Sequence, residues 1–376
     1  MTGDRGRLVT LVVVDGAGHV LGALPPRRVL LPWWQEVGPI VDAVPGVTVL
    51  RLLDAEPDRD GPMGGSVTYL VERNEEADGR TPDLDLRPWH GTLDEQPLRH
   101  PWARPGGPTE DHRWVAEQVH VIGPPRQHRS WNLSAIWSYP TTAGTVWLKC
   151  VPPFFGHEAA VLDLLVGEEV PRLLASEGHR MLLADLPGHD GHDAEEAEQA
   201  AMVDALVDLQ IRAADRTEAF LAAGVPDRRS PALLAELLEL IDRLAPPGDP
   251  RHRALAALAD ELPDRLARAD ACGPAPTLVH GDAHGGNCRL GTDHPLWFDW
   301  GDSFIGSPLL DLGAGAETSA SVRERWLSRW GERVPAAGEA WAALRPVTHV
   351  LQARVYQRFC DRIEPSERMY HRNDVP

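Results

Sequence analysis

The first third of the chain alternates short apolar runs with turn-forming residues, a pattern that is typical of strands. Residues 8–14 are almost continuously apolar, residues 19–24 are mixed, and Asp15-Gly16-Ala17-Gly18 lies between them. This arrangement predicts a β-hairpin, because Asp-Gly pairs favour tight turns between paired strands. One helix and two more strands are expected over residues 33–44, 48–53 and 66–72. We therefore expect a small α/β unit here.

Residues 73–108 interrupt this pattern and predict a linker, because they are rich in Asp, Glu, Arg, Pro and Gly. A second group of strands with one helix is expected beyond the linker. The strands are expected over residues 115–121, 133–139, 145–151 and 180–186, and the helix over residues 157–166. This region predicts a strand-rich lobe.

From residue 195 onward the apolar spacing is mostly helical. Helices are expected over residues 195–221, 231–244, 253–269, 319–330 and 336–363. A segment of short strands and loops, residues 277–311, interrupts them. The order predicts an α+β protein with an α/β cap domain and linker (residues 1–108), a strand-rich lobe with a hinge (109–188) and a helical lobe (189–376).

Composition narrows the class of protein. Of the 376 residues, 43% are hydrophobic and 25% are charged, a balance that excludes a disordered chain. The net charge of −19 argues against nucleic acid and membrane as partners, because both require a basic surface. The start of the chain has no cleavage site of small residues and no apolar run is long enough to span a membrane, so we expect a cytoplasmic protein. Four scattered cysteines predict no disulfide framework, and nothing here predicts an oligomeric state.

Nearly all of the basic residues are arginine. Of 37 Lys and Arg residues, Lys149 is the one lysine and the other 36 are arginine. Such a bias replaces lysines that are interchangeable with arginine, so a lysine that persists indicates a need for a compact ammonium group. Lys149 is therefore a candidate functional residue before any motif is considered.

Three oxygen-bearing side chains gather in the segment that interrupts the helices. His280-Gly281-Asp282 follows a short apolar strand, and Asn287 comes five residues after Asp282. A second strand then leads into Asp299. The two loops can therefore bring Asp282, Asn287 and Asp299 to one point.

Phosphoryl transfer from ATP requires this set of groups, since the protein mainly positions a hydroxyl and neutralises phosphate charge. Asp282 would accept the hydroxyl proton as catalytic base. Asn287 and Asp299 would bind Mg²⁺, which prefers oxygen ligands. Lys149 would contact the phosphates, and Glu158 would hold Lys149 through an ion pair.

The motifs resemble those of the aminoglycoside phosphotransferase/choline kinase family. The resemblance covers residues 110–376 and rests on H-G-D-x-H-x-x-N from His280, F-D-W from Phe298 and G-x-P-x-x-D-L from Gly306. It implies a protein-kinase-like fold with a strand-rich and a helical lobe, ATP and Mg²⁺ as cofactors, and a small-molecule hydroxyl acceptor. It assigns the roles given above to Asp282, Asn287, Asp299, Lys149 and Glu158. Asp311 resembles the family residue that braces the catalytic loop, and His280 is expected to be structural.

The sequence departs from a kinase pattern at the phosphate loop, because residues 126–137 contain no glycine. The family often has a short polar turn there, so Asn132 and Ser134 are candidate phosphate neighbours, with an ordinary turn as the alternative. Residues 182–188 resemble the hinge strand, where the backbone of Asp185 and Leu186 would contact adenine. Glu158 follows Lys149 by only nine residues, so Glu168 and Glu169 are alternative partners for the lysine.

The motifs describe the nucleotide end and leave the acceptor open. An amino-sugar or aminoglycoside fits the acidic chain, and a neutral sugar, nucleoside or other metabolite fits the motifs equally well. The polar end of the chain, with Glu364, Glu367 and Asp374, is expected either to close over the acceptor or to be a frayed tail.

Three further alternatives concern other functions. A catalytically silent pseudokinase would keep the fold without turnover, although Lys149, Asp282, Asn287 and Asp299 are all present. His280, Asp282 and His284 also spell H-x-D-x-H, which occurs in zinc hydrolases. The cap has some likeness to a Nudix α/β unit but lacks the clustered glutamates of those hydrolases, so we expect it to be non-catalytic.

Overall fold

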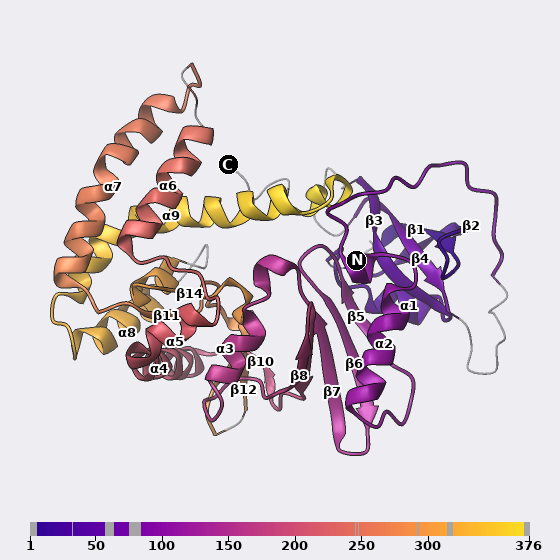
Figure 1. Cartoon of the computed structure of the whole chain (residues 1–376), viewed down its shortest axis with the longest axis horizontal. Helices are drawn as coiled ribbons and strands as arrows, with labels where there is room; N and C mark the ends of the chain where they lie inside the picture. Colours follow the sequence, from indigo (N-terminus) through magenta and orange to yellow (C-terminus); the bar gives the residue numbers. More distant parts are fainter. Residues whose placement is uncertain are drawn as a thin grey trace, which may run out of the picture. The chain divides into compact units, whose positions relative to one another are not determined.

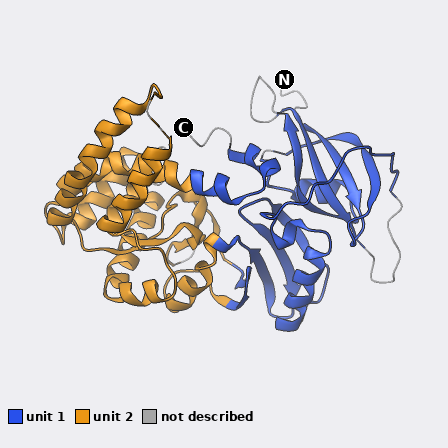
Figure 2. Ribbon diagram, turned by 45° about the horizontal axis from the view of Figure 1, so that its top comes forward, with its two compact units in different colours: residues 1–153, 174–185, 357–376 blue, residues 154–173, 186–356 orange. Residues whose placement is uncertain are grey.

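The structure is a computed structural model that describes residues 6–31, 33–56, 64–74, 84–244, 246, 248–291, 293–313 and 319–371. The chain forms two compact units (Figure 2). Unit 1 contains residues 1–153, 174–185 and 357–376, and unit 2 contains residues 154–173 and 186–356. Within the described residues, no helix is both long and apolar enough to cross a membrane.

The amino-terminal part of unit 1 is a four-stranded sheet in the order β2-β1-β4-β3, which is the cap (Figure 1). Its strands are β1 (Arg7–Val14), β2 (Val20–Val29), β3 (Val47–Glu56) and β4 (Ser66–Arg73). β1 and β2 form the predicted antiparallel hairpin, and β1 runs parallel to β4. Helix α1 (Gly38–Ala43) is shorter than the expected helix over residues 33–44. Pro39 explains this, because proline is accepted in the first turn of a helix but not further inside.

A second sheet of unit 1 has the order β5-β6-β7-β9-β8. Its strands are β5 (Arg126–Ser130), β6 (Ala135–Thr141), β7 (Gly144–Cys150), β8 (Leu173–Glu177) and β9 (Arg180–Ala184). β5 and β8 were not expected from the sequence. The antiparallel ladders β5–β6, β6–β7 and β7–β9 place Lys149 of β7 opposite Ile136 on one side and Met181 on the other.

The strand expected over residues 115–121 is wrong, because most of this segment belongs to helix α2 (Gly107–Gln118). Pro108 starts the helix in its first turn. Asp111, Trp114 and Val115 are buried at the i, i+3 and i+4 spacing of a helix face. Extended pairing is limited to a single bridge between Val121 and Thr141.

The carboxyl-terminal segment belongs to unit 1. Helix α9 (Ala337–Arg362) ends in this unit and is followed by the short 3₁₀ helix η7 (Pro365–His371). Met369 and Tyr370 of η7 pack against the apolar core of the cap. The end of the chain is therefore part of the same compact body as the cap.

Unit 2 is mostly helical around a few short strands. Its helices include α3 (Glu158–Leu164), α4 (Glu196–Ala213), α5 (Thr217–Ala222), α6 (Ser230–Leu244), α7 (His252–Cys272), α8 (Ala320–Gly331) and the first part of α9. The strands are β10 (His189–Asp190), β11 (Thr277–Val279), β12 (Cys288–Leu290), β13 (Leu296–Trp297) and β14 (Phe304–Gly306). The single helix expected over residues 195–221 is interrupted by a 3₁₀ turn at 214–216.

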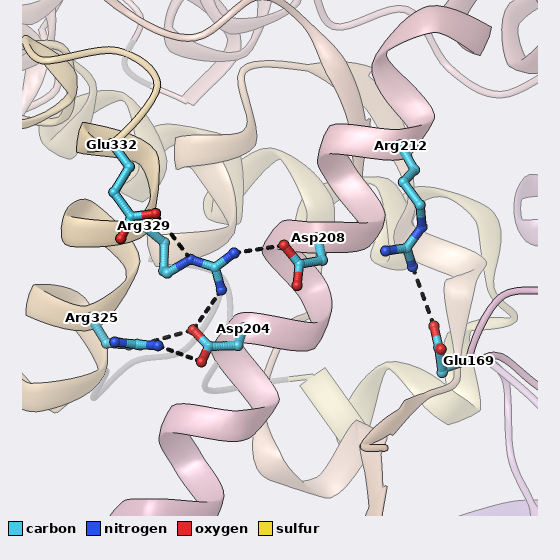
Figure 3. Close-up of polar contacts among 7 residues, drawn as sticks. All are labelled: Glu169, Asp204, Asp208, Arg212, Arg325, Arg329 and Glu332. Carbon is cyan, nitrogen blue, oxygen red and sulfur yellow. Dashed lines mark hydrogen bonds and ion pairs between the residues drawn. The ribbon is translucent and has the colours of Figure 1, made fainter. Parts of the chain in front are cut away.

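Ion pairs join α8 to α4 (Figure 3). Arg329 contacts Asp204 at 2.8 Å and Asp208 at 2.6 Å, and Arg325 contacts Asp204 at 2.5 Å. α4 itself starts at a capping box in which the side chain of Glu198 accepts the backbone N–H of Glu195. These contacts fix α4, which also supports the loop described next.

Candidate active site

The predicted catalytic loop begins at the end of a buried strand pair in unit 2. β11 pairs antiparallel with β14, and all three residues of β11 are buried. The hydroxyl of Thr277 on β11 donates to the carbonyl of Gln210 on α4 at 2.6 Å. Gly281 then turns the chain with a φ of +86°, which glycine adopts at low cost. A Cβ there would lie 2.2 Å from the carbonyl oxygen of Asp302, so glycine is required.

A buried carboxylate, that of Asp311, holds this turn by accepting hydrogen bonds from its backbone. Asp311 accepts the backbone N–H groups of His280 at 2.9 Å and of Gly281 at 2.7 Å. It also accepts Nε2 of Gln210 at 2.7 Å. Burial raises the pKa of Asp311 to about 7, against the effect of these donors. The geometry agrees with the expected brace. No pattern in the sequence indicates Gln210, because this residue lies on a helix far from the motif.

His280 is a structural residue in this geometry. Its ring is fully buried, and Nε2 donates to the carbonyl of Phe298 at 3.0 Å. Nδ1 accepts the backbone N–H of Asp282 at 3.3 Å. Burial lowers the pKa of His280 to about 4, so the ring is neutral near pH 7. Both ring nitrogens are used within the protein, which argues against the H-x-D-x-H zinc site.

Asp282 and Asn287 are in direct contact, as the sequence predicted. Nδ2 of Asn287 donates to Oδ2 of Asp282 at 2.8 Å and to its carbonyl at 3.0 Å. Nε2 of His284 lies 3.4 Å from the same Oδ2, while Nδ1 of His284 accepts the N–H of Gly286 at 3.0 Å. Hydrogen bonding to Asp282 raises the pKa of His284. The donors gather on Oδ2, and the Asp282 side chain keeps 41% of its surface exposed.

Asp299 is tied to the same loop through its neighbour in the chain. The N–H of Phe298 donates to the carbonyl of Asn287 at 3.0 Å, and the carbonyl of Phe298 accepts from His280. Asp299 itself has a φ of +65°, and within the described part of the chain it is the one non-glycine residue with a positive φ. Such a conformation costs about 1–2 kcal/mol and is concentrated at functional sites.

Lys149 and Glu158 belong to different units. Lys149 is 9% exposed on β7 of unit 1. Glu158, the first residue of α3, is 1% exposed and its Oε1 accepts the backbone N–H of Trp300 at 3.2 Å. The glutamate therefore contacts the residue that follows Asp299, and its pairing with Lys149 stays a prediction.

The alternative partners of the lysine have other contacts. Glu168 accepts from Arg212 at 2.7 Å and lies 3.6 Å from Arg216. Glu169 lies 3.2 Å from Arg212 (Figure 3). These ion pairs inside unit 2 favour Glu158 over Glu168 and Glu169.

The turn that replaces a glycine-rich loop is held by its own side chains. Asn132 is 1% exposed; its Nδ2 donates to the carbonyl of Glu367 at 3.4 Å and its Oδ1 accepts from Nε2 of His371 at 3.1 Å. Oγ of Ser134 accepts the indole N–H of Trp131 at 3.0 Å. This geometry favours the ordinary-turn interpretation for both side chains, and their contact with phosphate stays a prediction.

The predicted hinge follows β9 directly. The exposed side chain of Asp185 accepts the indole N–H of Trp147 at 2.6 Å, and Leu186 is half-buried. The hinge contacts expected from Asp185 and Leu186 involve their backbone, so this side-chain bond leaves them a prediction.

The carboxylates expected to reach the acceptor from the end of the chain are buried in unit 1. Glu364 is 3% exposed and pairs with Arg99 at 2.9 Å and Arg51 at 3.7 Å. Glu367 is 2% exposed, and burial raises its pKa to about 8. The expectation is therefore wrong for both residues, and Asp374 lies outside the described residues.

One further cluster carries groups that could in principle bind a metal. Asp111, Cys150 and His179 place their polar atoms within 4.8 Å of one another. Arg180, however, donates to Asp111 at 2.6 Å, and burial raises the pKa of the Cys150 thiol. The carboxylate thus already has a guanidinium partner and a protonated thiol beside it, which indicates a structural network.

A comparison with family models gives a match over residues 151–347, just over half of the chain, to the phosphotransferase enzyme family. Among curated proteins, a probable ketoamine kinase of Klebsiella pneumoniae is 47% identical over 49 residues. These residues are 12% of this chain and 37% of that protein, so the match spans little more than a third of the relative.

Solved structures show similar folds at low sequence identity. A macrolide 2'-phosphotransferase of Brachybacterium faecium has a TM-score of 0.51 at 16% identity, covering 71% of this chain and 97% of that one. A Plasmodium vivax ethanolamine kinase has a TM-score of 0.50 at 9% identity, covering 66% and 78%. An aminoglycoside 2'-phosphotransferase variant in complex with GDP has a TM-score of 0.51 at 15% identity, covering 70% and 95%.

Proposed function

The chain belongs to the phosphotransferase enzyme family, and we propose that it transfers phosphate to a hydroxyl group of a small molecule, with ATP as the phosphate donor and Mg²⁺ as the metal. The observation that carries the proposal is the hydrogen-bonded set around Asp282. An exposed carboxylate, a buried amide and a backbone-strained aspartate come from one connected loop system.

Asp282 is proposed as the catalytic base. Its Oδ2 is engaged by Asn287 and lies next to His284, so Oδ1 is the oxygen that would face the acceptor. The acceptor oxygen forms a bond to the γ-phosphorus as the bond between that phosphorus and the β–γ bridging oxygen breaks. ADP leaves with that electron pair, and Asp282 takes the hydroxyl proton.

Asn287 and Asp299 are proposed to hold the metal. The Nδ2 of Asn287 donates to Asp282, so the amide oxygen of Asn287 is the atom that would bind a cation. An amide oxygen and a carboxylate are hard donors that suit Mg²⁺. Bound there, the ion would neutralise charge on the phosphates.

Lys149 is proposed to contact the phosphates and Glu158 to orient Lys149. The low exposure of both residues supports this, because buried charged groups are normally paired. The backbone at Asp185 and Leu186 is proposed to contact the nucleotide base. A related fold binds GDP, so GTP is the second donor to test.

An amino-sugar or aminoglycoside is the proposed acceptor class. The net charge of −19 favours a cationic acceptor, and similar folds include an aminoglycoside phosphotransferase and an ethanolamine kinase. The short match to a probable ketoamine kinase also suggests an acceptor that combines a sugar and an amine. A neutral sugar, a nucleoside or another metabolite is the alternative acceptor.

The test is a coupled assay of nucleoside diphosphate release (ADP from ATP, GDP from GTP) with Mg²⁺ and a panel of acceptors. The panel contains aminoglycosides, ketoamines, amino alcohols, neutral sugars and nucleosides. We expect turnover with an amine-bearing acceptor and a phosphate monoester as product. Turnover only with neutral acceptors would overturn the acceptor class, and nucleotide binding without any turnover would support the pseudokinase alternative.

A further inference from the structure

The turn at residues 131–134 lies at the end of the β6–β7 ladder in unit 1, where Ala135 pairs with Cys150, the residue after Lys149. It joins β5 to β6, and Ile136 at the start of β6 pairs with Lys149 of β7. The turn is closed by two bonds at 3.0 Å from Trp131 to Ser134, one between backbone groups and one from the indole N–H to the hydroxyl. It contains no glycine. Its shape therefore depends on its surroundings.

The cap holds the strand that leads into this turn. The side-chain amide of Gln127 on β5 bonds both the N–H of Val49 at 2.9 Å and its carbonyl at 2.7 Å. The hydroxyl of Ser130 donates to the carbonyl of Leu50 at 3.0 Å. The register between β3 and β4 shifts between Val49 and Arg51. The side chains of β5 therefore bond to β3 at the point where the β3–β4 ladder of the cap is irregular. Gln127 and Ser130 are almost fully buried, which makes these bonds costly to lose.

The carboxyl-terminal helix η7 holds the turn itself. The amide of Asn132 lies between the carbonyl of Glu367 and Nε2 of His371, and Asn132 and His371 are both nearly fully buried. The ring of Trp131 meets the rings of Tyr370 and His371 at 5.6 and 5.8 Å. η7 therefore contacts both residues of the first half of the turn.

η7 is in turn anchored on the cap and linker. Glu364, just before η7, pairs with buried Arg99 and Arg51 at 2.9 and 3.7 Å. Tyr370 packs edge-on against Trp34 at 5.9 Å. The cap, the linker and the end of the chain thus form one frame around the turn.

We propose that the cap and the carboxyl-terminal segment serve to preform the 131–134 turn beside Lys149, and that His371 is the positioning residue that sets Asn132. This inference rests on the proposed function, since it assigns the turn to the phosphates of the nucleotide. In protein kinases a glycine-rich loop covers the phosphates, and its glycines leave the backbone conformationally free. Here a turn of fixed conformation takes the place of that loop. The affinity for the nucleotide should be higher as a result, because the turn loses little conformational entropy when the nucleotide binds.

The test measures nucleotide affinity without any acceptor. Isothermal titration of the full-length protein with Mg²⁺ and a non-hydrolysable ATP analogue is compared with titration by adenosine, which has no phosphates. We expect His371→Ala to weaken analogue binding by about fivefold or more and adenosine binding by less than about twofold, as one lost hydrogen bond at the phosphate end implies. His371→Gln keeps a donor for Asn132 and should recover most of the affinity.

His112→Ala is the matched control, because His112 bonds the hydroxyl of Tyr139 in the same unit. It should lower the thermal midpoint while both affinities stay unchanged. Equal weakening of adenosine and analogue by His371→Ala, or no weakening, overturns the inference. Wild-type protein that binds neither ligand would instead contradict the proposed function.

Discussion

At the scale of single residues, the carboxylate of Asp282 carries the chemistry. Asp282→Asn keeps the size and the bond partners of the side chain but cannot take a proton. We expect kcat to fall by about 10²–10⁴-fold, the usual cost of losing a general base. Affinity for the ATP analogue should stay within a few-fold. Steady-state ADP release and titration calorimetry measure the two quantities.

Asp190→Asn is the control for this substitution, because Asp190 is an exposed aspartate on β10 whose Oδ1 accepts the N–H of His192. It should leave kcat nearly unchanged. A similar loss in both variants would mean that Asp282 acts only through local charge.

Lys149 tests whether a lone lysine marks a function. Lys149→Arg keeps the positive charge but places a larger planar group at a site that is 9% exposed between Ile136 and Met181. We expect turnover to fall by about 10²-fold, because misplacement of a phosphate contact by about 1 Å has that effect. Wild-type turnover in the ADP-release assay would refute the argument from composition.

Some site residues were predictable because their contacts are local. Asn287 bonds Asp282 across five residues, so the motif alone implied their proximity. Asn132 bonds His371 across 239 residues, and no sequence pattern predicts that contact. Glu364 and Glu367 were misassigned for the same reason, since only the fold shows that the end of the chain is buried.

At the scale of elements, the protein-kinase-like α+β fold expected from the motifs is confirmed, while individual elements depend on context. The hydrophobic spacing identified α6, where Leu233, Leu237, Leu240 and Ile241 line one face. It failed at α2, because Val115, Val119 and Val121 also fit a strand. The start signal at Pro108 was the better guide.

The α4–α8 ion pairs allow a test of how firmly α4 is held. Arg329 is 17% exposed and contacts both Asp204 and Asp208. Arg329→Met therefore removes one of the positive charges that neutralise these two carboxylates. We expect a loss of about 1 kcal/mol in the free energy of unfolding, at the upper end for pairs near the surface. Urea denaturation in low and high salt measures the loss, which salt should reduce.

Arg265→Met is the comparison for this variant. Arg265 pairs with Glu261 across one helical turn of α7, and the glutamate is 56% exposed. Its removal should cost only about 0.3–0.5 kcal/mol. Equal losses in the two variants would show that the α4–α8 pairs add no more than an ordinary surface pair.

At the scale of the whole molecule, the sequence indicated three consecutive parts, and their boundaries stay a prediction. The structure groups the cap with the five-stranded sheet and the end of the chain in unit 1. Composition could mark the linker at 73–108 but could not show that Arg99 in it pairs with Glu364. Contacts between distant segments follow from packing, which local patterns do not contain.

The buried carboxyl of Glu367 should make the stability of this assembly depend on pH. Burial and then the neighbouring Glu364 raise its pKa from 4.5 to about 8, although the N–H of Leu52 and the charges of Arg51 and Arg99 oppose the shift. The native state therefore holds a proton that the unfolded chain has released. Its contribution to stability is greatest below pH 4.5 and is lost as the pH rises to about 8.

Glu367→Gln isolates this contribution, because an amide has the same shape and never ionises. Asp311, whose pKa burial raises to about 7, adds a dependence of the same sign in unit 2, so the comparison must be between wild type and variant. Thermal midpoints at pH 6 and pH 8.5 should fall less with pH in Glu367→Gln than in wild type. Parallel falls would mean that Glu367 ionises without cost, and that the frame around residues 131–134 tolerates a buried charge.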